Sequence, residues 1–201
     1  FNNDNNSMDD NGHGTNVAGI AAAKGTINGT APDAKLIAMK VCNSAGTSCH
    51  TNSIESAITW CVNNKTIYNI SVISISIGGG VYTDATCPLD AIDEINDAYA
   101  NNISVIIASG NNGYTTGISW PACRGNATSV GAVYDENLGK EPDSGSWSLA
   151  NCYDPTTTAD AISCFTNRAS NLDLLAPGCR INSTHINGGS GYQCGTSQAA
   201  P

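Results

Sequence analysis

The amino-acid sequence predicts an α/β domain in which buried parallel strands alternate with helices. Short runs that are apolar almost throughout are typical of strands covered on both faces. The segments between them repeat apolar residues with the helical period. The predicted strands are Lys35–Val41, Ser71–Ile77, Ile103–Ala108 and Ser129–Val133. An order of strand, helix, strand, helix, strand requires crossover connections, which are right-handed in nearly all sheets.

Two segments between the strands are predicted to be helices with one face against the sheet. The spacing i, i+3, i+4, i+7, i+8 defines the apolar face of the first, formed by Ile54, Ala57, Ile58, Cys61 and Val62. A similar repeat defines the second, formed by Ala91, Ile92, Ile95, Ala98 and Tyr99. The segment Tyr134–Arg168 is richer in Asp, Ser, Thr and Gly, and we interpret it as a long surface loop region.

The composition indicates one compact domain and excludes several classes of partner. The chain has 201 residues, of which 40% are hydrophobic and 12% charged. Its net charge of -9 argues against nucleic acid, which requires clustered Lys and Arg. No apolar run approaches the ~20 residues that span a bilayer, and the polar start Phe1–Asp4 is not a signal peptide. We expect a monomer.

The nine cysteines include no Cys-x2-Cys pair, so disulfides in an oxidising compartment explain them better than zinc. We therefore expect an extracellular, secreted protein. The odd number leaves one cysteine as a free thiol or with a partner outside this chain.

A histidine near the start of the chain is a candidate base. His13 precedes the Ala-rich run Val17–Ala23, which places it at a helix N-terminus. There the helix dipole disfavours the imidazolium and helps to keep the base neutral. A surface histidine in a turn is the alternative.

A serine near the other end is a candidate nucleophile. Ser197 follows Gly195-Thr196 and is predicted to open a helix with its hydroxyl and backbone N–H exposed. A nucleophilic serine needs a base and an oxyanion donor, and His13 and Asn111 are the candidates. Asn111 follows a predicted strand and presents an amide at its end. A serine that only caps a helix is the alternative.

These residues resemble, in their order, the motifs of the subtilisin-like serine proteases, the subtilases. The motifs are Gly12-His13-Gly14-Thr15, Ser109-Gly110-Asn111 and Gly195-Thr196-Ser197, and similar blocks lie at 29–36, 73–79 and 174–178. The resemblance covers most of the chain. It implies a three-layer fold with a mostly parallel central sheet and helices on both faces. It also implies an endopeptidase that acts on protein or peptide substrates and needs no cofactor for catalysis.

The resemblance implies a role for each site residue. Ser197 attacks the scissile carbonyl, His13 takes and returns the proton, and Asn111 with the Ser197 N–H binds the oxyanion. A substrate-binding edge, which would pair with an extended peptide, comprises Ser76, Ile77, Gly78 and Gly79. We expect modest selectivity for a sizeable apolar side chain. A strand-end turn without this role is the alternative for the edge.

The sequence departs from the family pattern in four places. The triad aspartate is expected upstream, outside these residues, because Asp4, Asp9 and Asp10 are too close to His13. The family also continues beyond Ser197 into a long helix, so we interpret 1–201 as a partial peptidase domain, neither stable nor active by itself. Asn16 stands where many members have a second histidine, and the Gln198 amide needs a partner if it is buried.

Calcium is a secondary hypothesis. Asp4, Asn6 and Asp9 offer alternating oxygen ligands and resemble a calcium-binding loop of some relatives, but the glycine and terminal glutamate of an EF-hand are absent. A solvated Asn/Asp turn is the alternative.

Three disulfides are expected from position, although sequence alone does not fix connectivity. They are Cys42–Cys49, Cys87–Cys123 and Cys152–Cys164. Cys194 as a thiol nucleophile is disfavoured, because Ser197 already fills that role.

Two rival functions belong to other classes. The first is a non-catalytic member of the fold that keeps a peptide-binding cleft but lacks the aspartate. The second is a nucleotide-binding domain that uses Gly78-Gly79-Gly80, which we discount because the Gly-x-Gly-x-x-Gly spacing and a Walker lysine are missing.

Overall fold

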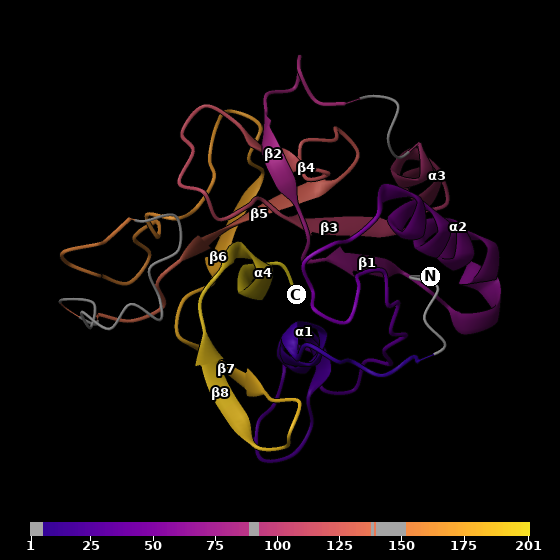
Figure 1. The fold of residues 1–201 in the computed structure, drawn as a ribbon, viewed down its shortest axis with the longest axis horizontal. Coiled ribbons are helices and arrows are strands. Elements are labelled where there is room, and N and C mark those ends of the chain that lie inside the picture. The colour runs from indigo at the N-terminus through magenta and orange to yellow at the C-terminus, as the bar shows by residue number, and fades with distance from the viewer. Residues whose placement is uncertain (1–5, 89–92, 138, 140–151) are drawn as a thin grey trace. The chain divides into compact units, whose positions relative to one another are not determined.

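A four-stranded sheet with the order β1-β3-β5-β6 organises the computed structural model, which describes residues 6–88, 93–137, 139 and 152–201 (Figure 1). Strand β5 pairs in parallel with both β3 and β6. Two smaller sheets pair β2 with β4, antiparallel, and β7 with β8. The predicted α/β class with a mostly parallel sheet is therefore confirmed.

The helices are α1 (His13–Ala22), α2 (Thr51–Tyr68), α3 (Glu94–Ala100) and α4 (Thr196–Ala199). The strands are β1 (Val72–Ile75), β2 (Gly79–Tyr82), β3 (Ser104–Ala108), β4 (Ile118–Trp120), β5 (Thr128–Val133), β6 (Leu174–Pro177), β7 (Ile181–Thr184) and β8 (Ser190–Gln193). None of the helices in the described part of the chain combines the length and the apolarity needed to cross a bilayer.

The chain divides into two compact units, each assembled from separate segments. Unit 1 comprises the described parts of Phe1–Ile73, Leu89–Val105 and Ser183–Gly191. Unit 2 comprises the described parts of Ser74–Pro88, Ile106–Asn182 and Tyr192–Pro201.

In unit 1, helix α1 is bound to the segment that begins at Ser183. The Ser183 hydroxyl donates to the Asn16 carbonyl at 2.7 Å, and the Thr184 hydroxyl donates to the Thr15 carbonyl at 2.7 Å. Gly19 permits this close approach, because a Cβ there would overlap both hydroxyls. Helices α2 and α3 also pack together in this unit (Figure 1).

In unit 2, a buried cluster connects the sheet to α4, which contacts β5 and β6. Its members are Ala108, Val130, Ala132, Tyr134, Phe165, Cys179, Ala199 and Ala200. Burial of these side chains fixes the start of α4 against the carboxyl ends of the strands, where ligands bind in open parallel sheets.

Three expectations from the sequence were wrong in part. Lys35–Val41, described throughout, forms no strand, because it pairs with no described strand; Leu36 and Ile37 are exposed. Tyr99, at the edge of the apolar stripe of α3, is exposed as well. The described parts of Tyr134–Arg168 are not all surface, since Tyr134 and Phe165 belong to the core; residues 138 and 140–151 lie outside the described residues.

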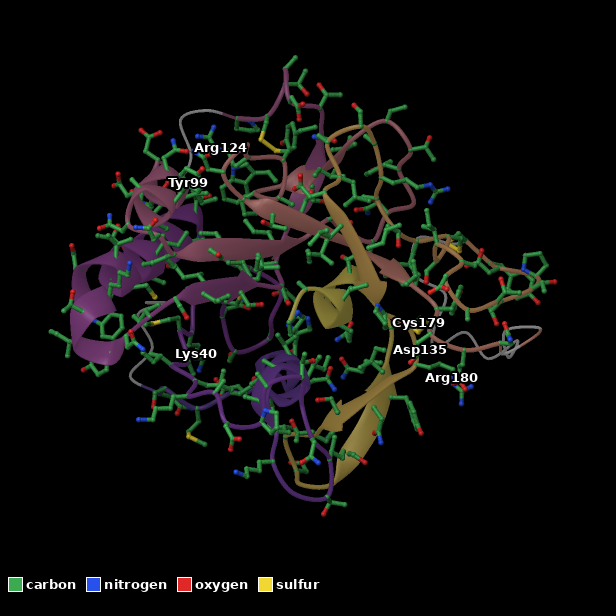
Figure 2. All side chains as sticks on the ribbon, turned by 180° about the vertical axis from the view of Figure 1, so that it is seen from behind. Lys40, Tyr99, Arg124, Asp135, Cys179 and Arg180 are labelled. Carbon is green, nitrogen blue, oxygen red and sulfur yellow. A yellow bond between two sulfur atoms is a disulfide. The ribbon has the colours of Figure 1, made fainter. Side chains whose placement is uncertain are left out.

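All three expected disulfides are confirmed, and a fourth was missed. It joins Cys179, which follows β6 and is labelled in Figure 2, to Cys194, three residues before Ser197. This bridge removes Cys194 as a thiol nucleophile. Cys61 on α2 is a free thiol, and burial raises its pKa.

Candidate active site

Ser197 lies at the start of α4 and is partly exposed. Its hydroxyl donates to the Ser76 carbonyl at 3.3 Å, and the Ser76 hydroxyl donates to the Ser197 carbonyl at 2.9 Å. Because α4 begins at Thr196, Ser197 lies in the first turn of a helix, as predicted. The reciprocal bonds bring the candidate nucleophile next to the first residue of the predicted substrate edge.

The side chain of Asn111 is oriented by Thr196. Asn111 Oδ1 accepts hydrogen bonds from Thr196 N at 2.8 Å and from Thr196 Oγ1 at 2.9 Å. Thr196 Oγ1 in turn accepts from Gly110 N at 3.1 Å. Both hydrogen-bond donors of Thr196 point at one end of the Asn111 amide, so that end must be the oxygen Oδ1 and the other end must be the nitrogen Nδ2. Within the described chain, Nδ2 meets no acceptor and remains available as a donor.

The predicted substrate edge differs from a free strand. Ser76, Ile77 and Gly78 lie between β1 and β2, outside both strands, while Gly79 opens β2 and pairs with Trp120 of β4. Gly78 and Gly79 are exposed. The backbone edge of Gly79 that faces β4 is thus already paired within the protein.

His13 is the first residue of α1, as predicted, and belongs to unit 1. Burial lowers its pKa, against the negative charge of Asp9, which acts to raise it. The lowered pKa favours the neutral imidazole, the form that can accept a proton.

Asp9 holds together the turn that leads into His13. Its Oδ1 accepts from Asn11 N and Gly12 N, and its Oδ2 accepts from Thr15 N and Thr15 Oγ1, at 2.7–3.0 Å. Partial burial acts to raise the pKa of Asp9, but these hydrogen bonds outweigh burial and lower that pKa to about 2.

The calcium hypothesis finds little support in this turn. Four donors use the four acceptor positions of the Asp9 carboxylate, so it has none to offer a cation. Asn6 Oδ1 accepts from Met8 N, and Asp4 lies outside the described residues. Across the described chain, no group of three or more His, Cys, Asp or Glu side chains is placed to hold a metal.

Unit 2 therefore brings together Ser197, Asn111 and Ser76, while His13 is placed within unit 1. Gln198 is buried, and its amide donates to Gln193 Oε1 at 3.0 Å, so the partner expected for it is present. Sequence reasoning assigned no role to Thr196 or to Asn167. The sequence carries little signal for such a role, because the role of a buried Thr or Asn depends on hydrogen-bond partners that only the fold brings close.

A partly exposed serine at a helix start, together with an oriented amide donor, is typical of serine hydrolases. Residues 1–201 match the sequence profile of the Subtilase family, and the chain belongs to this family. It is 34% identical to an alkaline proteinase of Hapsidospora chrysogena, over 96% of this chain and 41% of that protein. It is 29% identical to the minor extracellular protease Epr of Bacillus subtilis, over 96% of this chain and 25% of that protein.

A solved structure confirms the fold at the level of the family. A cold adapted subtilisin-like serine proteinase superimposes with a TM-score of 0.72 at 28% identity, covering 99% of this chain and 60% of that one. The chain thus spans less than two thirds of the relatives that it matches.

Proposed function

We propose that this chain contributes the nucleophile, the base and the oxyanion donor of a secreted serine endopeptidase. Ser197 Oγ attacks the scissile carbonyl carbon, and His13 accepts the hydroxyl proton and returns it to the leaving amine. Water then hydrolyses the acyl-enzyme, with His13 again as the base. The triad aspartate is proposed to lie outside these residues.

The orientation of Asn111 is the observation that best supports the proposal. An oxyanion donor must be aimed before the reaction at the position where negative charge develops. Both Thr196 donors face Asn111 Oδ1, so Nδ2 is held as a donor without a competing acceptor among the described residues. We propose that Nδ2 and the Ser197 N–H together bind the oxyanion.

The substrate is proposed to be a protein or peptide that binds in extended form along Ser76, Ile77, Gly78 and Gly79, with modest selectivity for a sizeable apolar side chain. The exposure of the two glycines supports this placement. Catalysis would need no cofactor, and the enzyme would act as a monomer. Four disulfides and an extracellular relative support secretion.

The test is labelling of the full-length protein with a fluorophosphonate, followed by peptide mapping. We expect the probe on Ser197, with labelling lost in Ser197→Ala and reduced below detection in His13→Ala. A peptide panel on the same protein tests selectivity, and a strict preference for a basic side chain would refute the apolar pocket.

The alternative is a subtilase-fold protein that binds peptides without cleaving them. A folded, fully processed protein that takes no label would favour it. Peptide binding by that protein, measured by calorimetry, would then establish the binding function.

A further inference from the structure

The geometry points to Asn167 as a positioning residue for the proposed oxyanion donor Asn111. Asn167 is fully buried and follows the core residue Phe165 by two positions. Its side chain forms its hydrogen bonds with Asn112, Tyr114 and Ser119. Any effect on catalysis must therefore pass through the loop 110–114, which carries Asn111. The inference rests on the proposed function.

Three hydrogen bonds connect Asn167 to the residues that flank Asn111. The Asn167 oxygen Oδ1 accepts from Asn112 N at 2.9 Å and from Tyr114 N at 3.1 Å. The backbone N–H of Asn167 donates to the Gly110 carbonyl at 2.9 Å. Asn167 therefore holds the loop at Gly110, immediately before Asn111, and at Asn112, immediately after it.

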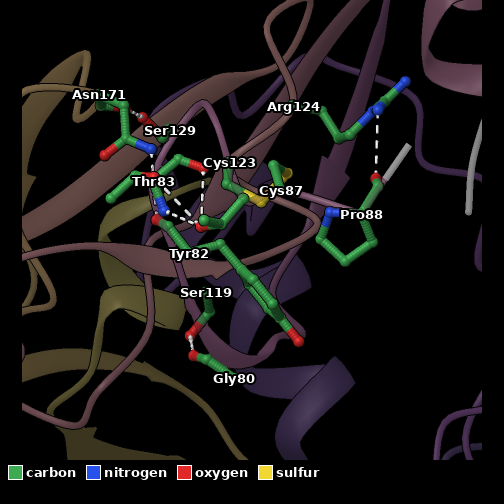
Figure 3. The surroundings of a disulfide bond; sticks show 11 residues. Gly80, Tyr82, Thr83, Cys87, Pro88, Ser119, Cys123, Arg124, Ser129 and Asn171 are labelled. Carbon is green, nitrogen blue, oxygen red and sulfur yellow. Dashed lines mark hydrogen bonds between the residues drawn. A yellow bond between two sulfur atoms is a disulfide. The ribbon is translucent and has the colours of Figure 1, made fainter.

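The remaining bond of the amide fixes Asn167 itself. Asn167 Nδ2 donates to Ser119 Oγ at 3.1 Å, and that hydroxyl donates to the Gly80 carbonyl at 3.1 Å, a bond drawn in Figure 3. The network leaves no room for a side chain on the loop, because a Cβ on Gly110 would overlap Ser119 Oγ and Asn167 Nδ2. The positive φ of Gly110, 103°, also favours glycine.

Two independent supports thus aim the Asn111 amide. Thr196 sets the rotation of the side chain through Oδ1, and Asn167 sets the path of the backbone that carries it. A donor that is displaced by about 1 Å loses much of its value in the transition state, of the order of 10²-fold in rate. Loss of Asn167 should therefore lower kcat and leave KM nearly unchanged.

The experiment is a double-mutant cycle in the full-length enzyme, made from Asn167→Ala, Asn111→Ala and the double variant. We expect Asn167→Ala to lower kcat by about ten- to a hundred-fold. In the Asn111→Ala background the same change should have little further effect, since the donor that it positions is gone. Equal losses of kcat in the two backgrounds, or unchanged kcat in folded Asn167→Ala, would overturn the inference.

A neighbouring variant separates positioning from stability. Thr166 is equally buried, but its hydroxyl bonds to Ala132 N and Ala132 O of β5 instead of the loop. Thr166→Val should lower the melting temperature and leave kcat unchanged. A loss of kcat in Thr166→Val as large as in Asn167→Ala would show that destabilisation of this segment alone explains the effect.

A conservative variant guards against a failure to fold. Asn167→Asp keeps an acceptor for both loop N–H groups, and the Ser119 hydroxyl can turn to donate to it by giving up its bond to the Gly80 carbonyl. Because the new carboxylate is fully buried, the melting temperature should fall. We expect this variant to retain most of kcat, and a loss as large as that in Asn167→Ala would count against loop positioning. Failure of the proposed function would look different, because wild-type Ser197 would then take no fluorophosphonate.

Discussion

Asn111 and Thr196 are joined by two hydrogen bonds that end on the same oxygen. Thr196 N and Thr196 Oγ1 approach Asn111 Oδ1 at 2.8 and 2.9 Å. Thr196 immediately precedes Ser197, so one residue connects the candidate nucleophile to the candidate oxyanion donor.

Asn111→Ala should lower kcat by roughly 10²–10³-fold with little change in KM. The range is the one typical of removing a single oxyanion-hole donor, which acts only in the transition state. Steady-state kinetics on a peptide substrate measures both constants. Asn182→Ala, an exposed position on β7, is the matched control and should behave as wild type; an equal loss there would contradict a specific role.

Thr196→Val should also lower kcat, by about tenfold, because it removes one of the two donors to Asn111 Oδ1 and the acceptor of Gly110 N. The backbone donor Thr196 N remains, so the loss should be smaller than in Asn111→Ala. Kinetics of both single variants and of the double variant measure the coupling. Additive effects on kcat would show that Thr196 does not act through the Asn111 amide.

Asp9→Asn should move the acid limb of kcat/KM to lower pH. The Asp9 carboxylate acts to raise the pKa of His13, so its removal should let His13 stay neutral in more acidic solution. A pH profile of wild type and variant, corrected for the fraction of active enzyme, measures the shift. An acid limb displaced toward higher pH would contradict the expectation that Asp9 raises the pKa of His13.

The same substitution should change the pH dependence of stability. The pKa of Asp9 falls from 3.8 to about 2 in the folded protein, so folding favours its ionised form. The resulting stabilisation is complete above pH 3.8 and is lost as the pH falls through about 2. Urea unfolding of inactive Ser197→Ala protein, with and without Asp9→Asn, should show a stability difference that shrinks between pH 5 and pH 2. A constant difference would mean that the carboxylate is not the cause.

Replacing Cys179 and Cys194 together by alanine should lower stability by about 3 kcal/mol in the chain-entropy description, since this bridge spans 15 residues. The bridge ends three residues before Ser197, so we also expect slower fluorophosphonate labelling. The matched control replaces Cys42 and Cys49, whose bridge spans 7 residues. That control should be less destabilised and should label at the wild-type rate.

The sequence predicted the elements that have strong local patterns. Apolar runs located β1, β3 and β5, and helical spacing located α2, because buried faces leave a periodic record in the chain. Lys35–Val41 has the same composition as a strand, but strand formation depends on a partner for its backbone. The residues of the segment do not reveal whether a partner strand is available.

Short motifs in the sequence pointed to Ser197 and Asn111 as candidates, and the structure joins both to Thr196. The supporting residues were not predictable, because their roles come from contacts between distant segments. Asn167 reaches Asn112 across 55 positions, and Thr196 reaches Asn111 across 85. Asp9 was proposed as a calcium ligand because a carboxylate in a loop looks alike in sequence whether it binds a cation or backbone N–H groups.

The buried thiol of Cys61 gives the protein an internal reporter. Within residues 1–201 the other eight cysteines are paired, so Cys61 is the one free thiol of this part of the protein. Burial and a raised pKa both suppress the reactive thiolate. The alkylation rate of Cys61 therefore reports how often local opening of α2 exposes its thiol. Mass spectrometry can follow this opening without any engineered label.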